Sequence, residues 1–388
     1  MFSQSETVDE LGGRQAFVVI ADELFPGTSV LHTRARYLVF IPWLCRLAAA
    51  KPNPRANLDR LERTLIGRFL EDDTVAASDR LQGLVGGRTG VKVKQLPSTA
   101  YWSGLTRWEI LQRPGTINDA LLSTAADLRR RSDADELAER NPSTWHPGVG
   151  VAPKQFLEGT IDGGFELRAE EAAWLLERWQ QTAQGSLLTH LAEATAPLAS
   201  APAPWLEPAS LSASPAMRSV LEDAERFSLA LEGGQRLYQL LVAEEYVRSG
   251  LSGVEVDLDG IRSLIDGWVE RAAARSELFD GWESRAFWSF LRSRNPRISP
   301  ATEGFFDCWF NVLCHASFDR LADDHGLRQV VTDREVALKK PAQSRLKNPK
   351  MLAAWRANDP PPVTYRWAQV QQLVRDVHRG LGVGDVRP

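Results

Sequence analysis

The feature that most constrains this chain is an apolar segment, residues 28–50, that carries two arginines near its start. A turn at Pro26 precedes it, and its apolar positions recur with helical spacing, so we expect a helix over the whole segment. Arg34 and Arg36 interrupt its buried surface. A buried guanidinium is very costly without a partner. The segment therefore requires either a carboxylate of the same chain or an anionic ligand, and the sequence leaves both alternatives open.

Composition places the chain among globular proteins. Of its 388 residues, 43% are hydrophobic and 25% are charged, and the length suffices for two domains. The net charge of −4 argues against a protein that coats nucleic acid without specificity. The three cysteines form no CxxC motif, the N-terminus is polar and acidic, and the longest apolar runs fall short of the roughly 20 residues that span a bilayer. We therefore expect a cytoplasmic protein without a membrane partner.

Arginine dominates the basic residues. Eight of the 46 basic residues are lysines, which leaves 38 arginines. A GC-rich genome produces such a bias. Phosphate or carboxylate recognition also favours it, because the planar guanidinium with its five donors suits these groups better than an ammonium does. Composition does not separate the two explanations.

Helical periodicity dominates the chain, so the expected fold is mainly α, with minor short strands. Helices are expected over residues 8–24, 28–50, 58–70, 168–183, 216–231, 235–249, 257–278, 282–292, 302–324 and 367–379. A short basic strand or a loop is expected at 91–94, and a strand at 161–167. Changes in composition divide the chain into an N-terminal helical lobe (1–145), a connector with one helix and a loop rich in Pro, Ala and Ser (146–215), and a C-terminal helical domain (216–388) with a basic arm (333–350).

A stretch over residues 83–90 is too rich in glycine for a helix interior and leads into a basic segment. It approaches a phosphate-binding loop but misses the GxxxxGKS/T pattern. The simplest interpretation is a flexible basic turn. If the turn binds a ligand, its backbone amides together with Arg88, Lys92 and Lys94 would suit a phosphate diester.

The sequence contains no complete metal-binding or catalytic motif. Cys308, Cys314 and His315 share an apolar helix, but structural zinc requires four ligands at recognisable spacing, so we interpret the thiols as core residues. The GxSxG nucleophile motif is absent. We expect neither a metal nor a cofactor, and the sequence does not decide whether the protein is an enzyme.

One acidic segment, residues 255–259, is the candidate for a metal-dependent nuclease site. Glu255, Asp257 and Asp259 alternate as on a strand, but the lysine that a restriction-type nuclease would need does not follow them. The alternative is that Asp257 or Asp259 caps the helix that begins here.

Lysines concentrate in the basic arm, which holds four of the eight. Its basic residues are Arg334, Lys339, Lys340, Arg345, Lys347 and Lys350. Two prolines keep the arm from forming one continuous helix. The arm is either a solvated surface segment, or it contacts phosphates or an acidic partner.

Five segments occur in a fixed order along the chain. They are LFPGTSVLHTRARYLVFIPWL at 24–44, KQLPSTAYWSGLTRW at 94–108, GSLL at 185–188, REVALK at 334–339 with SRL at 344–346, and YRW at 365–367. Together they resemble a bacterial family described only as a domain of unknown function, over about residues 11–381. The first segment is the most specific, and the stretch 197–215 has no counterpart in the family. The family has no assigned activity. Its members often lie near DNA-modification, helicase or restriction genes, which implies a role in defence against mobile elements.

These observations favour a non-catalytic, DNA-associated component of a bacterial anti-phage defence or DNA-processing complex, with other subunits as partners. Two surfaces would face DNA. The first comprises Arg34, Arg36, Arg88, Lys92 and Lys94, and the second comprises Arg334, Lys339, Lys340, Arg345 and Lys347. Two alternatives stay open. One is a metal-dependent nuclease with an unrecognised site, and the other is a protein–protein scaffold without DNA contact, whose arginines are paired internally.

Overall fold

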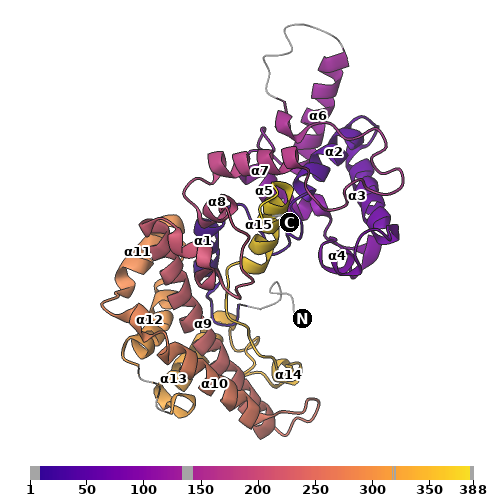
Figure 1. Cartoon of the computed structure of the whole chain (residues 1–388). Helices are drawn as coiled ribbons and strands as arrows, with labels where there is room; N and C mark the ends of the chain where they lie inside the picture. The colour runs from indigo at the N-terminus through magenta and orange to yellow at the C-terminus, as the bar shows by residue number, and fades with distance from the viewer. Residues whose placement is uncertain (1–8, 133–142, 317, 319, 385–388) are drawn as a thin grey trace. The chain divides into compact units, whose positions relative to one another are not determined.

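The computed structural model describes residues 9–132, 143–316, 318 and 320–384 (Figure 1). This part of the chain is built from helices joined by turns and loops. Its only β pairing is an isolated antiparallel bridge between Leu111 and Trp145. The mainly α fold predicted from the sequence is therefore confirmed. None of the helices in the described ranges has both the length and the apolar character needed to cross a membrane.

The helices form two compact units, each of them discontinuous in sequence. Unit 1 comprises residues 1–21 and 218–365, and unit 2 comprises residues 22–217 and 366–388. The C-terminal residues thus belong to the same unit as most of the N-terminal half. The segment boundaries expected after residues 145 and 215 stay predictions.

The bounds of the elements are as follows. Unit 2 contains α2 (Tyr37–Ala49), α3 (Pro54–Glu71), α4 (Ala77–Gln82), α5 (Pro97–Arg107), α6 (Ile117–Ser132), α7 (Ala169–Thr182), α8 (Leu187–Ala192) and α15 (Trp367–Gly380), with short 3-10 helices η2 (Gly90–Lys92), η4 (Pro147–Val149), η5 (Pro204–Leu206) and η6 (Pro208–Ser212). Unit 1 contains α10 (Leu258–Ala273), α11 (Ser284–Arg294), α12 (Pro300–Cys314), α13 (His325–Lys339) and α14 (Pro349–Ala353), with η7 (Ser276–Phe279) and η8 (Leu321–Asp323). The helices α1 (Arg14–Leu24) and α9 (Pro215–Arg248) have residues in both units.

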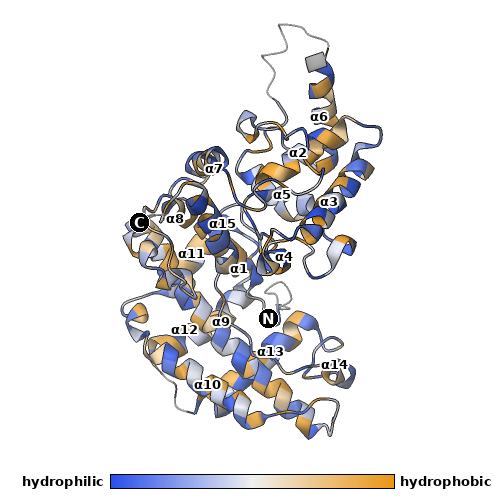
Figure 2. Ribbon diagram, turned by 45° about the vertical axis from the view of Figure 1, so that its right-hand side comes forward, coloured by the Kyte–Doolittle hydropathy of each residue, from blue (hydrophilic) through white to orange (hydrophobic). Residues whose placement is uncertain are grey.

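The core of unit 2 is organised around α2. This helix packs against α3, α5 and α6, and its side chains from Tyr37 to Cys45 are all buried. Its ribbon is accordingly coloured mostly as hydrophobic (Figure 2). A helix that is apolar on all sides is stable only when protein surrounds it. In the same unit, α15 packs against α7 and α8.

The helix predicted over residues 28–50 begins only at Tyr37, so its first part was wrongly predicted. The backbone amides just before α2 donate to acceptors far away in sequence. Those of Thr33 and Arg34 bind the Tyr101 hydroxyl at 2.7 and 2.9 Å, and that of Ala35 binds a carboxylate oxygen of Asp376 at 2.8 Å. Tertiary acceptors therefore hold these residues in turns in place of a helix.

Residues 161–167, predicted as a strand, form turns. Gly163 and Gly164 have φ of 73° and 53°, a left-handed conformation that no strand contains. The carbonyls of Asp162 and Gly164 accept from Arg36, so a guanidinium takes the place of a neighbouring strand. The segment at 91–94 was predicted as a short strand or a loop. Its first two residues, Val91 and Lys92, belong to the 3-10 helix η2, and no strand forms there.

The two helices predicted at 216–231 and 235–249 are one helix, α9. The sequence suggested a break because glycine is a poor helix former, and Gly233 and Gly234 are adjacent. In the structure a Cβ at Gly233 would lie 2.6 Å from the Trp268 ring and 2.8 Å from the Trp309 ring. The missing side chain thus makes room for two tryptophans, and packing overrides helix propensity.

Other predicted helices agree with the structure to within a few residues. Those at 58–70, 168–183 and 367–379 correspond to α3, α7 and α15, and the one at 282–292 corresponds to α11. Three were predicted too long. The helix expected to begin at residue 8 begins at Arg14. The helix expected to reach residue 278 ends at Ala273, and the one expected to reach residue 324 ends at Cys314.

Candidate functional site

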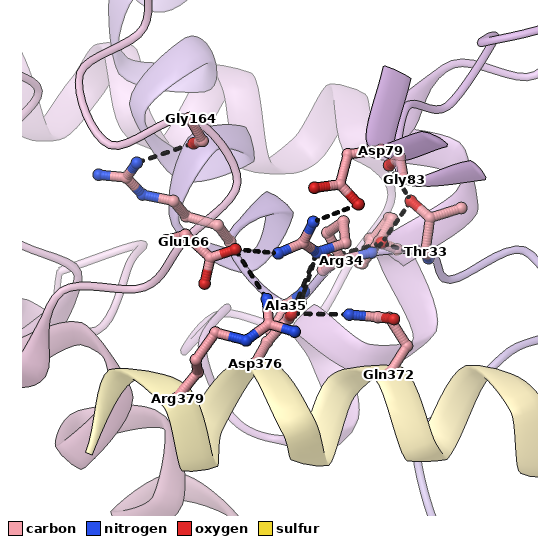
Figure 3. A network of polar contacts seen from close by, with 12 residues as sticks. Thr33, Arg34, Ala35, Asp79, Gly83, Gly164, Glu166, Gln372, Asp376 and Arg379 are labelled. Carbon is pink, nitrogen blue, oxygen red and sulfur yellow. Dashed lines mark hydrogen bonds and ion pairs between the residues drawn. The ribbon is translucent and has the colours of Figure 1, made fainter. Parts of the chain in front are cut away.

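Arg34 lies immediately before α2 in unit 2 and is surrounded by carboxylates (Figure 3). Its Nε donates to both oxygens of Asp376 at 3.0 Å, and its Nη2 donates to Glu166 at 2.8 Å. Its Nη1 lies 3.5 Å from Asp79. The side chain is only 2% exposed. Of the two alternatives that the sequence left open for this residue, the structure contains the internal carboxylate partner.

Asp376 projects from α15 and is fully buried. Besides Arg34 it accepts from the Ala35 amide and from the Gln372 side chain, each at 2.8 Å. Burial lowers the pKa of Arg34, but its pairing with Asp376 and Glu166 outweighs this effect and raises the pKa. Burial also raises the pKa of Asp376, and the charge of Arg34 opposes that shift. The pair ties α15 to the segment that precedes α2.

Arg36 is also held inside unit 2. Its Nε donates to Glu171 at 3.2 Å, and its Nη1 donates to the carbonyls of Asp162 and Gly164 at 2.7 and 2.8 Å. Its side chain is 1% exposed. Burial lowers its pKa and Glu171 opposes that shift. The contacts fix the 161–167 turns against the start of α2.

Glu166 joins the Arg34 site to the surface. Its carboxylate accepts from Arg34 and from Arg379 of α15, each at 2.8 Å (Figure 3). Arg379 is about half exposed, so the network runs from a buried ion pair to a solvated one. The side chains of this network bind one another and the backbone. The network thus holds together three segments of the chain, namely the residues before α2, the 161–167 turns and α15.

The turn after α4 has a different character. Arg88, Lys92 and Lys94 are all exposed and form no ion pair with any described residue. The turn is seated on α3, because Arg63 donates to the carbonyl of Val91. Three cations therefore extend into solvent from a fixed backbone, as a phosphate-contacting surface requires.

Sequence reasoning missed one residue of this surface, Arg60. Positions 60, 63 and 67 lie on one stripe of α3, and η2 packs over that stripe at Gly67 and Arg63. Arg60 is exposed, and within the described ranges its side chain donates to Asn57 alone, at 3.2 Å. The helical spacing of these residues was visible in the sequence, but the position of η2 on α3 was not. We call Arg60, Arg88, Lys92 and Lys94 the η2 surface.

In the basic arm of unit 1, Arg334 is buried. Its Nε donates to the Leu11 carbonyl and its Nη2 to the Thr302 hydroxyl, both at 2.9 Å. Its guanidinium also lies over the Phe305 ring, 5.4 Å from the centroid. Arg334 therefore anchors the N-terminal segment.

Lys339 and Arg345 form an internal ion cluster. Both pair with Glu10, and Lys339 also lies 3.6 Å from Glu335, which is fully buried. Glu335 accepts from the Arg345 amide at 2.8 Å. Burial and the charge of Arg345 lower the pKa of Lys339 to about 8. Neither cation extends freely into solvent.

The remaining lysines of the arm are accessible. Lys340, Lys347 and Lys350 are exposed and form no ion pair with any described residue. Of the ten predicted nucleic-acid contacts, five are thus exposed and unpaired: Arg88, Lys92, Lys94, Lys340 and Lys347. The other five bind groups of the chain itself: Arg34, Arg36, Arg334, Lys339 and Arg345.

The acidic candidates for metal chemistry are exposed. The Asp257 carboxylate accepts from the Gly260 amide at 2.8 Å and so caps α10, in agreement with the helix-entry interpretation. In the described part of the chain no three His, Cys, Asp or Glu side chains are grouped so that they could hold a metal ion.

Comparison with known proteins identifies the family. Residues 1–378 match the family described as "Family of unknown function (DUF6361)". The chain belongs to this family. No curated protein and no solved structure matches it. The matched residues include parts of both units, with Arg34, Arg36, Asp376 and the η2 surface among them, and Arg379 lies one residue beyond the match.

Proposed function

We propose that this DUF6361 protein is a non-catalytic, DNA-associated component of a bacterial anti-phage defence or DNA-processing complex. It acts in the cytoplasm with other subunits, and the η2 surface contacts the phosphate backbone. Lys340 and Lys347 supply a second contact from unit 1.

The observation that supports this proposal is the contrast between two classes of basic residue. Arg34 and Arg36 are desolvated and bound by carboxylates and carbonyls of unit 2. Arg88, Lys92 and Lys94 have no anionic partner among the residues that the structure describes, although the chain carries a net charge of −4. Exposed cations without partners bind the phosphates of nucleic acids. This binding releases counterions that are condensed on the nucleic acid, and it needs no defined site geometry.

Fluorescence anisotropy with a labelled DNA duplex tests the proposal. We expect binding by the full chain to weaken steeply between 50 and 200 mM salt. In the triple variant Arg88→Gln, Lys92→Gln, Lys94→Gln, the slope of log affinity against log salt should fall in magnitude by roughly 2.7, because each phosphate contact contributes about 0.9. Lys154→Gln is the matched control, since Lys154 is exposed and unpaired elsewhere in unit 2.

Two results would contradict the proposal. One is the absence of binding at 50 mM salt, and the other is a triple variant with the slope of the unmodified chain. The first result together with capture of neighbouring gene products without DNA would favour the scaffold alternative. Internal pairing of Arg34 and Arg36 is the observation that supports that alternative.

A further inference from the structure

A cleft of about 590 Å³ opens in unit 1 between α10 and the start of α13. It is lined by Arg262, Arg320, Arg328, His325, Asp323 and Asp324. Its volume lies in the range of small-molecule sites. None of these residues belongs to the η2 surface or to the basic arm, so the cleft has no role in the function proposed above.

Two of the three arginines share one carboxylate. Arg262 donates to one oxygen of Glu244 at 3.0 Å, and Arg328 donates to the other. Arg262 also donates to Asp323 at 3.0 Å. Glu244 and Asp323 therefore fix these two guanidiniums at the cleft and balance their two charges.

Asp323 indicates where the cleft stabilises negative charge. A hydrogen bond from Arg262 and the charge of Arg262 lower the pKa of Asp323, and the charges of Arg320 and Arg328 lower it further. All three guanidiniums therefore act on one position.

Arg320 is the guanidinium that remains available. It is exposed and forms no ion pair with a described residue. Its φ of 54° is left-handed, a conformation that side chains other than glycine and asparagine rarely adopt, so the backbone holds it in an unusual direction. The side chain of the other aspartate, Asp324, caps α13, because it accepts from the Leu327 amide at 2.8 Å.

We propose that this cleft binds a phosphate monoester, with Arg320 and Arg328 on its oxygens. The arginine side chains carry this binding, because the Leu327 amide in the first turn of α13 is already bound to Asp324. A dianionic monoester matches three arginines better than a diester does, because its charge is compact and accessible on three oxygens. The source of the monoester is free phosphate, a nucleotide or the 5′ end of a nucleic acid.

Calorimetric titration of the full chain separates these sources. The probes are inorganic phosphate, AMP with adenosine as its phosphate-free counterpart, and a short oligonucleotide with or without a 5′-phosphate. We expect inorganic phosphate and AMP to bind and adenosine not to bind, and we expect a 5′-phosphate to tighten oligonucleotide binding beyond any contact made by the η2 surface. Arg320→Asn should weaken this phosphate-dependent binding roughly tenfold or more, the effect of losing one charge-assisted hydrogen bond. Asparagine tolerates the left-handed backbone, so this variant retains the fold.

The control is Arg285→Asn, which removes an exposed, unpaired arginine from α11 in the same unit. It should leave affinity unchanged. The phosphorylated probe whose affinity falls most in Arg320→Asn identifies the source. The proposal is overturned if no phosphorylated probe binds, if adenosine binds as tightly as AMP, or if Arg320→Asn binds like the unmodified chain. Because the test does not depend on the η2 surface, it can fail while the DNA-binding proposal stands.

Discussion

At the scale of single residues, buried charges determine which substitutions unit 2 can tolerate. Arg34 and Asp376 are almost completely removed from solvent, and each is the main compensation for the other. A buried pair of this kind contributes modestly compared with an apolar substitute, but removing one partner leaves a bare charge in the core. The pair is therefore a point of fragility more than a source of net stability.

Arg34→Leu should destabilise the protein by about 3–5 kcal/mol, because Asp376 is left buried without its cation. Arg379→Leu removes the half-exposed partner of Glu166 and should cost only about 0–1 kcal/mol. Urea unfolding measures both changes. Equal losses would show that the buried pair is solvated in the folded protein.

Glu62 makes stability depend on pH. It is buried on α3 and accepts from the amide and hydroxyl of Ser98. Burial raises the pKa of Glu62 from 4.5 to about 7. Because the folded state holds this proton more tightly than the unfolded chain, the stabilisation is complete below about pH 4.5 and is lost as pH rises through about 7.

Glu62→Gln removes this titration and keeps the hydrogen bonds with Ser98. Relative to the unmodified chain, the variant should therefore become more stable between pH 5 and pH 8. Denaturant unfolding at the two pH values measures the difference. Glu71→Gln, an exposed change on the same helix, serves as the control and should show no such gain. If the free energy of unfolding differed between Glu62→Gln and the unmodified chain by the same amount at both pH values, the raised pKa of Glu62 would be contradicted.

At the scale of elements, apolar periodicity predicted where most helices lie. It succeeded for α3, α7 and α15, whose buried faces repeat with helical spacing. It failed where a distant group fixes the backbone. Residues before α2 bind Tyr101 and Asp376, and the 161–167 turns bind Arg36, so no local pattern could reveal either conformation.

The continuity of α9 gives a prediction in which packing and propensity oppose each other. Gly233→Ala improves helix propensity by about 1 kcal/mol, yet its Cβ would lie 2.6 Å from Trp268, so the net change should be destabilising. Gly267→Ala on α10 is the matched control. Its Cβ meets only the end of Arg271 at 3.8 Å, and the change should stabilise the protein by about 0.5–1 kcal/mol. Thermal unfolding that ranks the two variants in the opposite order would refute this account.

At the scale of the whole molecule, the sequence showed where basic residues concentrate but not which of them are free. Glu10 forms ion pairs with Lys339 and Arg345, which lie more than 300 positions away in the sequence. Only the folded chain reveals these pairs. The turn carrying Arg88, Lys92 and Lys94 was recognisable from its glycines and its charge. Arg60 joined it only through the packing of η2 on α3.

Binding and stability should be separable in this molecule. The Arg88, Lys92 and Lys94 triple variant removes solvated charges that contact no described carboxylate, so its free energy of unfolding should change by less than about 0.5 kcal/mol per site while DNA affinity falls. Urea unfolding beside the anisotropy titration checks this. A large loss of stability would mean that the turn is part of the core.

The distribution of unit 2 along the chain has a consequence for protein synthesis. Arg34 leaves the ribosome 342 residues before Asp376, its buried partner. At about 5–20 residues per second, the interval is roughly 20–70 s. Throughout that time the nascent unit lacks α15, and the Arg34 guanidinium must stay hydrated or be held by Glu166 and Asp79. The core of unit 2 is therefore completed only after α15 has been synthesised, although most of the unit is made before most of unit 1.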